Sequence, residues 1–353
     1  MSYLWMPRTG VGRKIGARMI TNLQPRALPA WQRSLQSAFT RPAELLSYLQ
    51  LDAALPALDL ASRRDFPLRV PRSYAARMHK GDPSDPLFLQ VWPAPLEGEQ
   101  TPGFTRDAVG DLQKMKAGGL IHKYEGRALV IATGACAVHC RFCFRRHFPY
   151  SDALASRDHW QAVLQTLSSD RSIHEVILSG GDPLSLADDK LAELAEALEF
   201  LPHVRRLRIH TRQPIVLPER IDADFLHWFL RGRLQKVMVL HTNHAQELDE
   251  TVAAGLRPLR NAGVTLLNQA VLLRGVNDSV RTQRELSERL FECGLIPYYL
   301  HLLDRVQGTA HFEVRHEEGA SIVQQLSQQL PGYLVPRLVR EEPGAPAKVA
   351  VWQ

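Results

Sequence analysis

The pattern of apolar and polar residues changes in character along the chain. From about residue 127, short apolar runs alternate with longer stretches in which apolar residues recur every three or four positions. The short runs are typical of buried strands and the longer stretches of amphipathic helices. The predicted strands are 128–133, 175–179, 207–211, 237–242, 265–273 and 296–302, and the predicted helices lie near 158–168, 188–200, 222–231, 246–261 and 279–293. This alternation predicts an α/β fold of parallel β/α units, either a doubly wound sheet or a full or partial barrel.

The two ends of the chain lack this alternation. Residues 20–55 and 71–91 predict short helices, and the segment 92–103 is rich in proline and glycine and predicts a linker. Near the other end, residues 332–340 predict an extended segment. We therefore expect an N-terminal helical region with its linker over 1–103, a barrel over 104–310, and a C-terminal helix and tail over 311–353.

Composition places the chain among ordinary globular proteins. It has 353 residues, of which 45% are hydrophobic, and a formal net charge of +6. The apolar runs are shorter than the roughly 18 residues that a membrane span needs. The basic first residues lack the apolar segment of a secretory signal, so we expect a cytoplasmic protein, whether it starts at Met1 or at Met19. Acidic and basic residues are interspersed, which favours an enzyme over a protein that binds nucleic acid directly.

Three cysteines form a local cluster immediately after the first predicted strand. They are Cys136, Cys140 and Cys143. Soft thiolates at this spacing favour zinc or an iron–sulfur cluster. A structural zinc ion would need a fourth protein ligand, for which His139 and His147 are the local candidates, whereas a four-iron cluster can use three cysteines and leave one iron open. The fourth cysteine, Cys293, is distant in sequence and is expected to be a buried core thiol.

The triplet, with Phe142 before its last cysteine, resembles the radical S-adenosylmethionine (SAM) superfamily. The glycine-containing turn after the second predicted strand supports this resemblance; its residues are Ser179, Gly180, Gly181 and Asp182. Glycines there would let the backbone approach a ligand without a clash. The resemblance implies a partial (β/α)6 barrel of the radical SAM type. It also implies a 4Fe-4S cluster on the three cysteines, SAM on its open iron, and contacts to SAM from this turn and from Gln269.

Further segments narrow the resemblance to the lysine 2,3-aminomutase family. They are 122–127, 136–148, 216–221, 267–278 and 297–299. The likeness runs from about residue 65 to the end. The segment 69–73 and the short C-terminus are closest to the bacterial branch that makes (R)-β-lysine for modification of elongation factor P.

That family also uses pyridoxal phosphate (PLP), which needs a lysine to hold it covalently and donors for its phosphate. Lys348 matches the family's PLP lysine, and Lys123, Tyr124 and Arg127 match its phosphate-binding segment. From its position alone, Lys348 would be taken for a solvated surface lysine, and the other three residues are compatible with an exposed polar turn.

The resemblance also implies three residues that bind substrate. Arg145 matches the family's carboxylate-binding arginine, and Asp304 and Glu341 match the acids that hold the ε-ammonium group of lysine. Without the resemblance, these two acids would be taken for ordinary surface salt bridges. Position 341 is Glu where the longer enzymes carry Asp, which adds a methylene to this site.

The resemblance therefore predicts an isomerase that converts L-lysine to (R)-β-lysine, supplying a lysine ligase that modifies elongation factor P. A flavodoxin or ferredoxin would be its reductant. Two alternatives remain: an aminomutase for another amino acid such as glutamate, and a non-catalytic iron–sulfur or zinc protein that binds RNA or a translation factor. Free or protein-attached lysine, and the oligomeric state, also stay open.

Overall fold

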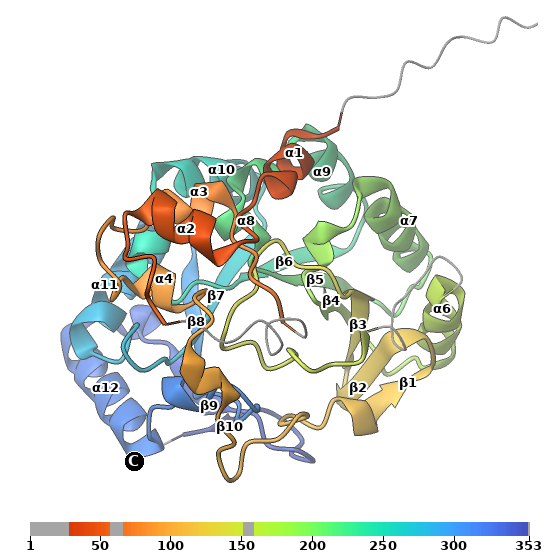
Figure 1. The fold of residues 1–353 in the computed structure, drawn as a ribbon. Coiled ribbons are helices and arrows are strands. Elements are labelled where there is room, and N and C mark those ends of the chain that lie inside the picture. The colour runs from red at the N-terminus through yellow and green to blue at the C-terminus, as the bar shows by residue number, and fades with distance from the viewer. Residues whose placement is uncertain (1–27, 57–65, 151–158, 352–353) are drawn as a thin grey trace, which may run out of the picture.

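A single curved sheet forms the centre of the molecule in the computed structural model, which describes residues 28–56, 66–150 and 159–351. Its ten strands pair in chain order from β1 to β10 (Figure 1). They are β1 (Met115–Lys116), β2 (Leu120–Tyr124), β3 (Arg127–Thr133), β4 (Glu175–Gly180), β5 (Arg206–Thr211), β6 (Gln235–Leu240), β7 (Thr265–Val271), β8 (Ile296–His301), β9 (Arg337–Arg340) and β10 (Val349–Ala350). Neighbours from β3 to β9 are parallel, and the strands at both edges pair antiparallel. Within the described residues no pairing joins β10 to β1, so the barrel is partial.

Helices connect the parallel strands and cover the outside of the sheet. The α-helices are α1 (Ala30–Gln36), α2 (Pro42–Leu49), α3 (Arg72–Ala75), α4 (Pro86–Leu89), α6 (His159–Ser169), α7 (Asp188–Glu199), α8 (Gln213–Val216), α9 (Ala223–Phe229), α10 (Glu250–Asn261), α11 (Val280–Glu292) and α12 (His316–Gln329). The short 3-10 helices are η1 (Pro95–Gly98), η2 (Leu112–Lys114), η3 (Ala117–Gly119), η4 (Pro183–Ser185), η5 (Pro218–Arg220), η6 (Ala245–Glu247), η7 (Ala310–Phe312) and η8 (Gly332–Leu334). The helices α6, α7, α9, α10, α11 and α12 lie around the ring of strands (Figure 1).

The predicted α/β alternation is confirmed, including all six strands and five helices. The structure adds one parallel strand, since β9 pairs with β8 through Tyr299 and Arg337. The extended segment predicted over 332–340 therefore begins as a 3-10 helix and becomes a strand. Residues 20–27 of the first predicted helical stretch, and residues 352–353, lie outside the described residues.

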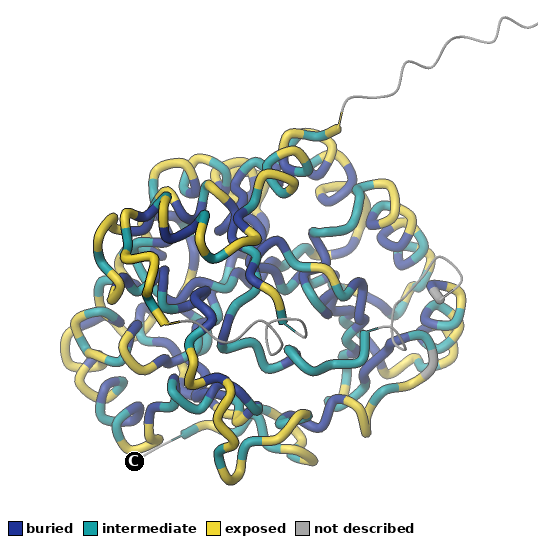
Figure 2. The backbone as a smooth tube through the Cα atoms, viewed as in Figure 1, coloured by how far each residue is buried: buried dark blue, intermediate teal, exposed yellow. Residues whose placement is uncertain are grey.

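Burial and capping explain why these segments take these forms. The sheet and the covering helices share one large apolar core (Figure 2). Along β5 the pattern alternates, so that Leu207 and Ile209 are fully buried in this core, while His210 between Ile209 and Thr211 belongs to the other face of the strand. Helices α9 and α10 begin at Asp222 and Asp249, whose carboxylates accept hydrogen bonds from the first-turn backbone.

The N-terminal helices build a second apolar core. Trp31 and Leu45, from α1 and α2, are buried in it together with Ala137 and Val138 of the cysteine loop. In Figure 1 these helices lie over one side of the ring of strands. The cysteine loop is therefore packed between the barrel and the N-terminal region. In the described part of the chain, no helix has both the length and the apolar content needed to cross a membrane.

Candidate active site

Two adjoining cavities lie along the parallel strands. The cysteine cavity lies at their carboxyl ends, where α/β folds carry their sites, and the lysine cavity extends to Arg127 and Glu175 at the amino ends of β3 and β4. The cysteine cavity, of about 160 Å³, is lined by the three clustered cysteines and by residues after β4, β5, β6 and β8. The lysine cavity, of about 300 Å³, is lined by residues of β2, β3, β4, β5 and β8 and by Lys348. Seven residues line both cavities: Phe144, Arg145, Ser179, His210, Gln269, Glu341 and Lys348.

The three cysteines lie on one loop after β3 and face one cavity as free thiols. Burial raises the pKa of all three, in the case of Cys143 to about 11. No three metal-ligating side chains among the described residues converge tightly enough to hold a single ion. Three thiols that face one cavity fit a 4Fe-4S cluster, in which three cysteines ligate three irons and the fourth iron stays open.

Neither local histidine supports a zinc site. The Nδ1 atom of His139 lies 2.8 Å from the Pro67 carbonyl oxygen, and its ring stacks on Phe66. The Nε2 atom of His147 lies 3.1 Å from the Gln307 carbonyl oxygen. Neither ring is among the residues that line the cysteine cavity, so neither is placed as the fourth ligand that a tetrahedral zinc site would need there.

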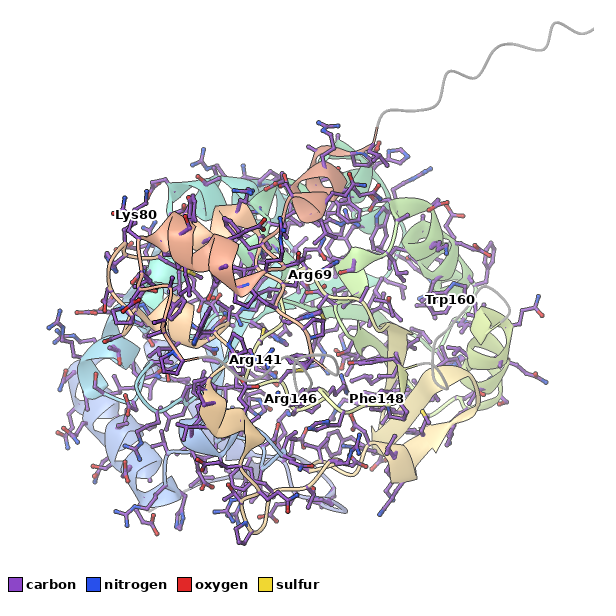
Figure 3. All side chains as sticks on the ribbon, in the orientation of Figure 1. Arg69, Lys80, Arg141, Arg146, Phe148 and Trp160 are labelled. Atoms are coloured by element: carbon purple, nitrogen blue, oxygen red, sulfur yellow. The ribbon has the colours of Figure 1, made fainter. Side chains whose placement is uncertain are left out.

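A buried ion-pair cluster anchors the cysteine loop. Arg141, between the second and third cysteines, donates from Nε to Glu97 Oε1 at 2.7 Å, and Arg146 donates to the other oxygen of the same carboxylate. All three side chains are nearly inaccessible to solvent. Figure 3 shows Arg141 and Arg146 close to each other near the middle of the ring of strands. The acidic partner, Glu97, belongs to η1 in the predicted linker. The linker therefore helps to fix the position of the cysteine loop.

Several buried polar atoms around the cysteine cavity have no hydrogen-bond partner among the described residues. They are Gln269 Oε1, His210 Nε2, His241 Nε2 and His301 Nε2. Burial lowers the pKa of all three histidines, which keeps them neutral. Unsatisfied buried polar atoms are costly unless a ligand pairs with them, so this lining fits a polar ligand such as SAM. The sequence analysis missed the three histidines, although each lies at or just after the end of a strand.

The glycines after β4 line the cysteine cavity and are also required by the packing of the backbone. Gly180 has a φ of 125°, and a Cβ atom there would lie 2.6 Å from the Thr133 carbonyl oxygen. A Cβ atom on Gly181 would lie 2.5 Å from the Ala135 carbonyl oxygen. The absence of side chains therefore lets the ends of β3 and β4 approach each other, and the role of these glycines in ligand approach stays a prediction.

Asp182 is likewise held by protein groups. Its carboxylate accepts hydrogen bonds from Thr211 Oγ1 at 2.7 Å and from the backbone N–H groups of Leu184, Arg212 and Gln213. These bonds join the end of β4 to the end of β5. Asp182 therefore fixes the shape of the cysteine cavity where the ends of β4 and β5 meet.

Lys348, beside β10, is held inside the lysine cavity. Its Nζ atom donates to Glu341 Oε1 at 2.8 Å, and the hydroxyl of Tyr124 donates to the other oxygen of Glu341. The Lys348 side chain is 19% exposed, and its ammonium lies 5.8 Å from the centre of the Tyr299 ring. Burial works against the charge on Glu341, but Lys348 holds the pKa of this carboxylate below its usual value. This arrangement contradicts the alternative of a solvated surface lysine.

Asp111 is a site residue that the sequence analysis missed. Its carboxylate pairs with Lys123 Nζ at 2.5 Å and with Arg145 Nε at 2.8 Å. Arg145 also donates to Ser179 Oγ at 3.0 Å, and Arg127 stacks over the Tyr124 ring. Burial alone would raise the pKa of Asp111, but the two cations hold it below its usual range. The predicted cations are thus brought together on one wall of the lysine cavity.

Asp304 lies after β8 and lines the cysteine cavity. With Glu341 it also lines a third cavity of about 740 Å³, which adjoins the other two. Burial raises the pKa of Asp304 to about 7, although Lys348 opposes this shift. A half-buried carboxyl of this kind, facing a cavity, is suited to an incoming cation.

Comparison with known proteins adds an independent line of evidence. Residues 130–223 match the model of the radical SAM superfamily. The chain is 47% identical to L-lysine 2,3-aminomutase of Escherichia coli, over 90% of this chain and 93% of that protein. It is 45% identical to the Haemophilus influenzae L-lysine 2,3-aminomutase, over 90% and 94%, and 30% identical to that of Clostridium subterminale, over 91% and 77%.

Among solved structures, a radical SAM methyltransferase from Sphaerobacter thermophilus is similar with a TM-score of 0.45 and 17% identity, over 63% of this chain and 68% of that chain.

Proposed function

Because the chain belongs to the lysine 2,3-aminomutase family of radical SAM enzymes, an isomerase family, we propose that it converts L-lysine to (R)-β-lysine using PLP. The observation that carries the proposal is that Lys348, Arg145 and Gln269 line both the cysteine cavity and the lysine cavity. When bound, the 4Fe-4S cluster with SAM supplies a hydrogen-abstracting radical, and PLP supplies a conjugated system that tolerates an unpaired electron.

The lysine cavity offers the groups that PLP requires. Lys348 is its covalent anchor in this proposal, and Glu341 beside it keeps the amine in place until PLP binds. Lys123, Tyr124 and Arg127 supply two cations and a phenol for the phosphate group, a donor set suited to a dianion. Cys136, Cys140 and Cys143 hold the cluster, while Ser179, Gln269 and the backbone at Gly180 and Gly181 bound the space for SAM.

The charges on the cavity walls favour lysine as substrate. A bidentate guanidinium such as that of Arg145 suits an α-carboxylate. Asp304 and Glu341, which line the cysteine cavity with Arg145, offer two carboxyl groups for the ε-ammonium group. A glutamate substrate would place its own carboxylate against these two acids, which like-charge repulsion disfavours.

The product's destination is a further part of the proposal. The resemblance to the short bacterial branch supports free L-lysine as substrate, with (R)-β-lysine passed to a ligase that modifies elongation factor P. A flavodoxin or ferredoxin in the cytoplasm would supply the electron.

Covalent capture of PLP tests the anchor assignment directly. The reconstituted protein is incubated with PLP, reduced with borohydride and mapped by peptide mass spectrometry. We expect the label on Lys348 and its loss in Lys348→Ala. Lys236→Ala is the matched control, because Lys236 is mostly buried and paired with Glu199, and it should retain the label. A label on another lysine would contradict the assignment.

A further inference from the structure

Arg212 is a buried residue that the proposed function leaves unassigned. It directly follows β5 and lines the cysteine cavity. Its Nη1 atom donates a hydrogen bond to the Cys140 sulfur at 2.8 Å. The guanidinium plane also lies 5.4 Å from the centre of the Phe142 ring, so it contacts two residues of the cysteine loop.

The position of this guanidinium is fixed by residues from three other segments. Its Nη2 atom, which carries two N–H groups, lies within hydrogen-bond distance of Glu247 Oε2 at 2.8 Å, Gln90 Oε1 at 2.7 Å and the Tyr74 hydroxyl at 3.0 Å. Glu247 is itself fully buried, and its other oxygen accepts from the backbone N–H of Asn243 at 2.9 Å. These contacts already fix the planar guanidinium through Nη2. Its Nη1 atom therefore donates to the Cys140 sulfur with little further loss of side-chain conformational freedom.

We propose that Arg212 is a positioning residue that raises the reduction potential of the iron–sulfur cluster through its hydrogen bond and charge at the Cys140 sulfur. This inference rests on the cluster of the proposed function. Reduction adds one electron to a cluster whose ligands are already anionic, so a donor and a cation at a ligand sulfur stabilise the reduced form more than the oxidised form. Glu247 partly offsets the positive charge of Arg212. The reduction potential of the cluster therefore depends on the balance between the Arg212 cation and the Glu247 anion.

Two substitutions with opposite expected effects separate this role from a merely structural one. The reduction potential of the reconstituted cluster is measured by redox titration with electron paramagnetic resonance, without SAM or PLP. Arg212→Gln removes the charge and the guanidinium donor, so we expect a shift to more negative potential. Glu247→Gln leaves the Arg212 charge uncompensated, so we expect a shift to more positive potential. A general loosening of the fold would not give opposite signs.

A third variant covers the case in which Arg212→Gln leaves Glu247 buried without a partner and the protein fails to fold. The double variant Arg212→Gln/Glu247→Gln removes both charges. It should fold, and its potential should lie below that of the wild type because the donor is lost. Arg220→Lys is the control: this buried arginine pairs with Asp188 and contacts the Trp31 ring, so its substitution should leave the potential unchanged.

The possible results distinguish this inference from the proposed function. Equal potentials in the wild type, Glu247→Gln and the double variant, each with an intact cluster, would overturn the role of Arg212 and leave the aminomutase assignment standing. A shift of the same sign in the Arg212 and Glu247 variants would also overturn it. A wild-type protein that takes up no 4Fe-4S cluster would overturn both.

Discussion

The carboxyl group of Asp304 shows how burial prepares a single residue for a ligand. Its pKa of about 7 is raised by burial and lies well above the value of about 3.9 for an unfolded chain. Between these values the folded protein binds more protons at Asp304 than the unfolded chain does, so the contribution of Asp304 to the free energy of unfolding falls as pH rises through this window. Ionised Asp304 is the form that attracts an ammonium group.

Replacement of Asp304 by Asn should remove this pH dependence. Between pH 5 and pH 7 the wild type should lose about 2–3 kcal/mol of unfolding free energy relative to Asp304→Asn, at 1.36 kcal/mol per pKa unit. Urea denaturation at several pH values measures the difference. Parallel stability curves for the two proteins would show that Asp304 titrates normally.

The two acids assigned to the ε-ammonium group should act together. The Asp304→Asn/Glu341→Gln double variant should abolish lysine turnover, and Asp304→Asn alone should raise KM about 10- to 100-fold, since a hydrogen bond to a charged group contributes about 1.5–3 kcal/mol. Glu292→Gln is the control, because Glu292 is exposed, pairs with Arg289 and lines none of the three cavities. Unchanged lysine kinetics in the double variant would refute the ammonium site.

At this scale, sequence analysis identified residues with a local motif and missed those defined by distant partners. The three cysteines are recognisable by their spacing, and Lys348 by the segment around it. These residues could therefore be predicted from the sequence. Asp111 is recognisable as a site residue only because it pairs with Lys123 and Arg145 in the folded protein. Arg212 is recognisable only because it donates a hydrogen bond to Cys140. No short sequence pattern encodes such contacts.

The cysteine loop is an element whose form depends on the linker that precedes the barrel. Glu97 of η1 supplies the single carboxylate that pairs with both Arg141 and Arg146. The linker was predicted from its prolines and glycines. Its anchoring of the cysteine loop through Glu97 was not predicted, because a lone glutamate in a loop is usually solvated.

Removal of Glu97 should therefore damage the loop. Glu97→Ala would leave two buried guanidinium groups without their counterion and should cost about 3–5 kcal/mol of unfolding free energy. We also expect lower iron and sulfide content after reconstitution. Glu99→Ala, in the same linker, is the control. Full cluster content and unchanged stability in Glu97→Ala would contradict the anchoring role.

Among the strands, periodicity predicted the six that carry continuous apolar runs. It did not reveal β9 as a seventh parallel strand. Only Leu338 and Val339 of its residues are buried, and its pairing with β8 depends on tertiary contacts. Short strands at the side of a sheet leave too little pattern to be recognised.

The whole molecule joins one apolar core in the barrel to a second under the N-terminal helices. Because Ala137 and Val138 belong to the second core, the cysteine loop is stabilised from both sides. The alternating pattern was sufficient to predict parallel β/α units but left a doubly wound sheet and a full or partial barrel open, and the resemblance to the radical SAM superfamily supplied the choice of a partial barrel. The division at residues 103 and 310 stays a prediction.

An anaerobic turnover measurement tests the central claim most directly. The protein is reconstituted with iron, sulfide and PLP, given SAM, dithionite and L-lysine, and the products are resolved by chiral mass spectrometry. The account predicts (R)-β-lysine. Release of 5′-deoxyadenosine without β-lysine would contradict the substrate assignment. Neither product, from a protein with an intact cluster and bound PLP, would contradict the proposed aminomutase function itself.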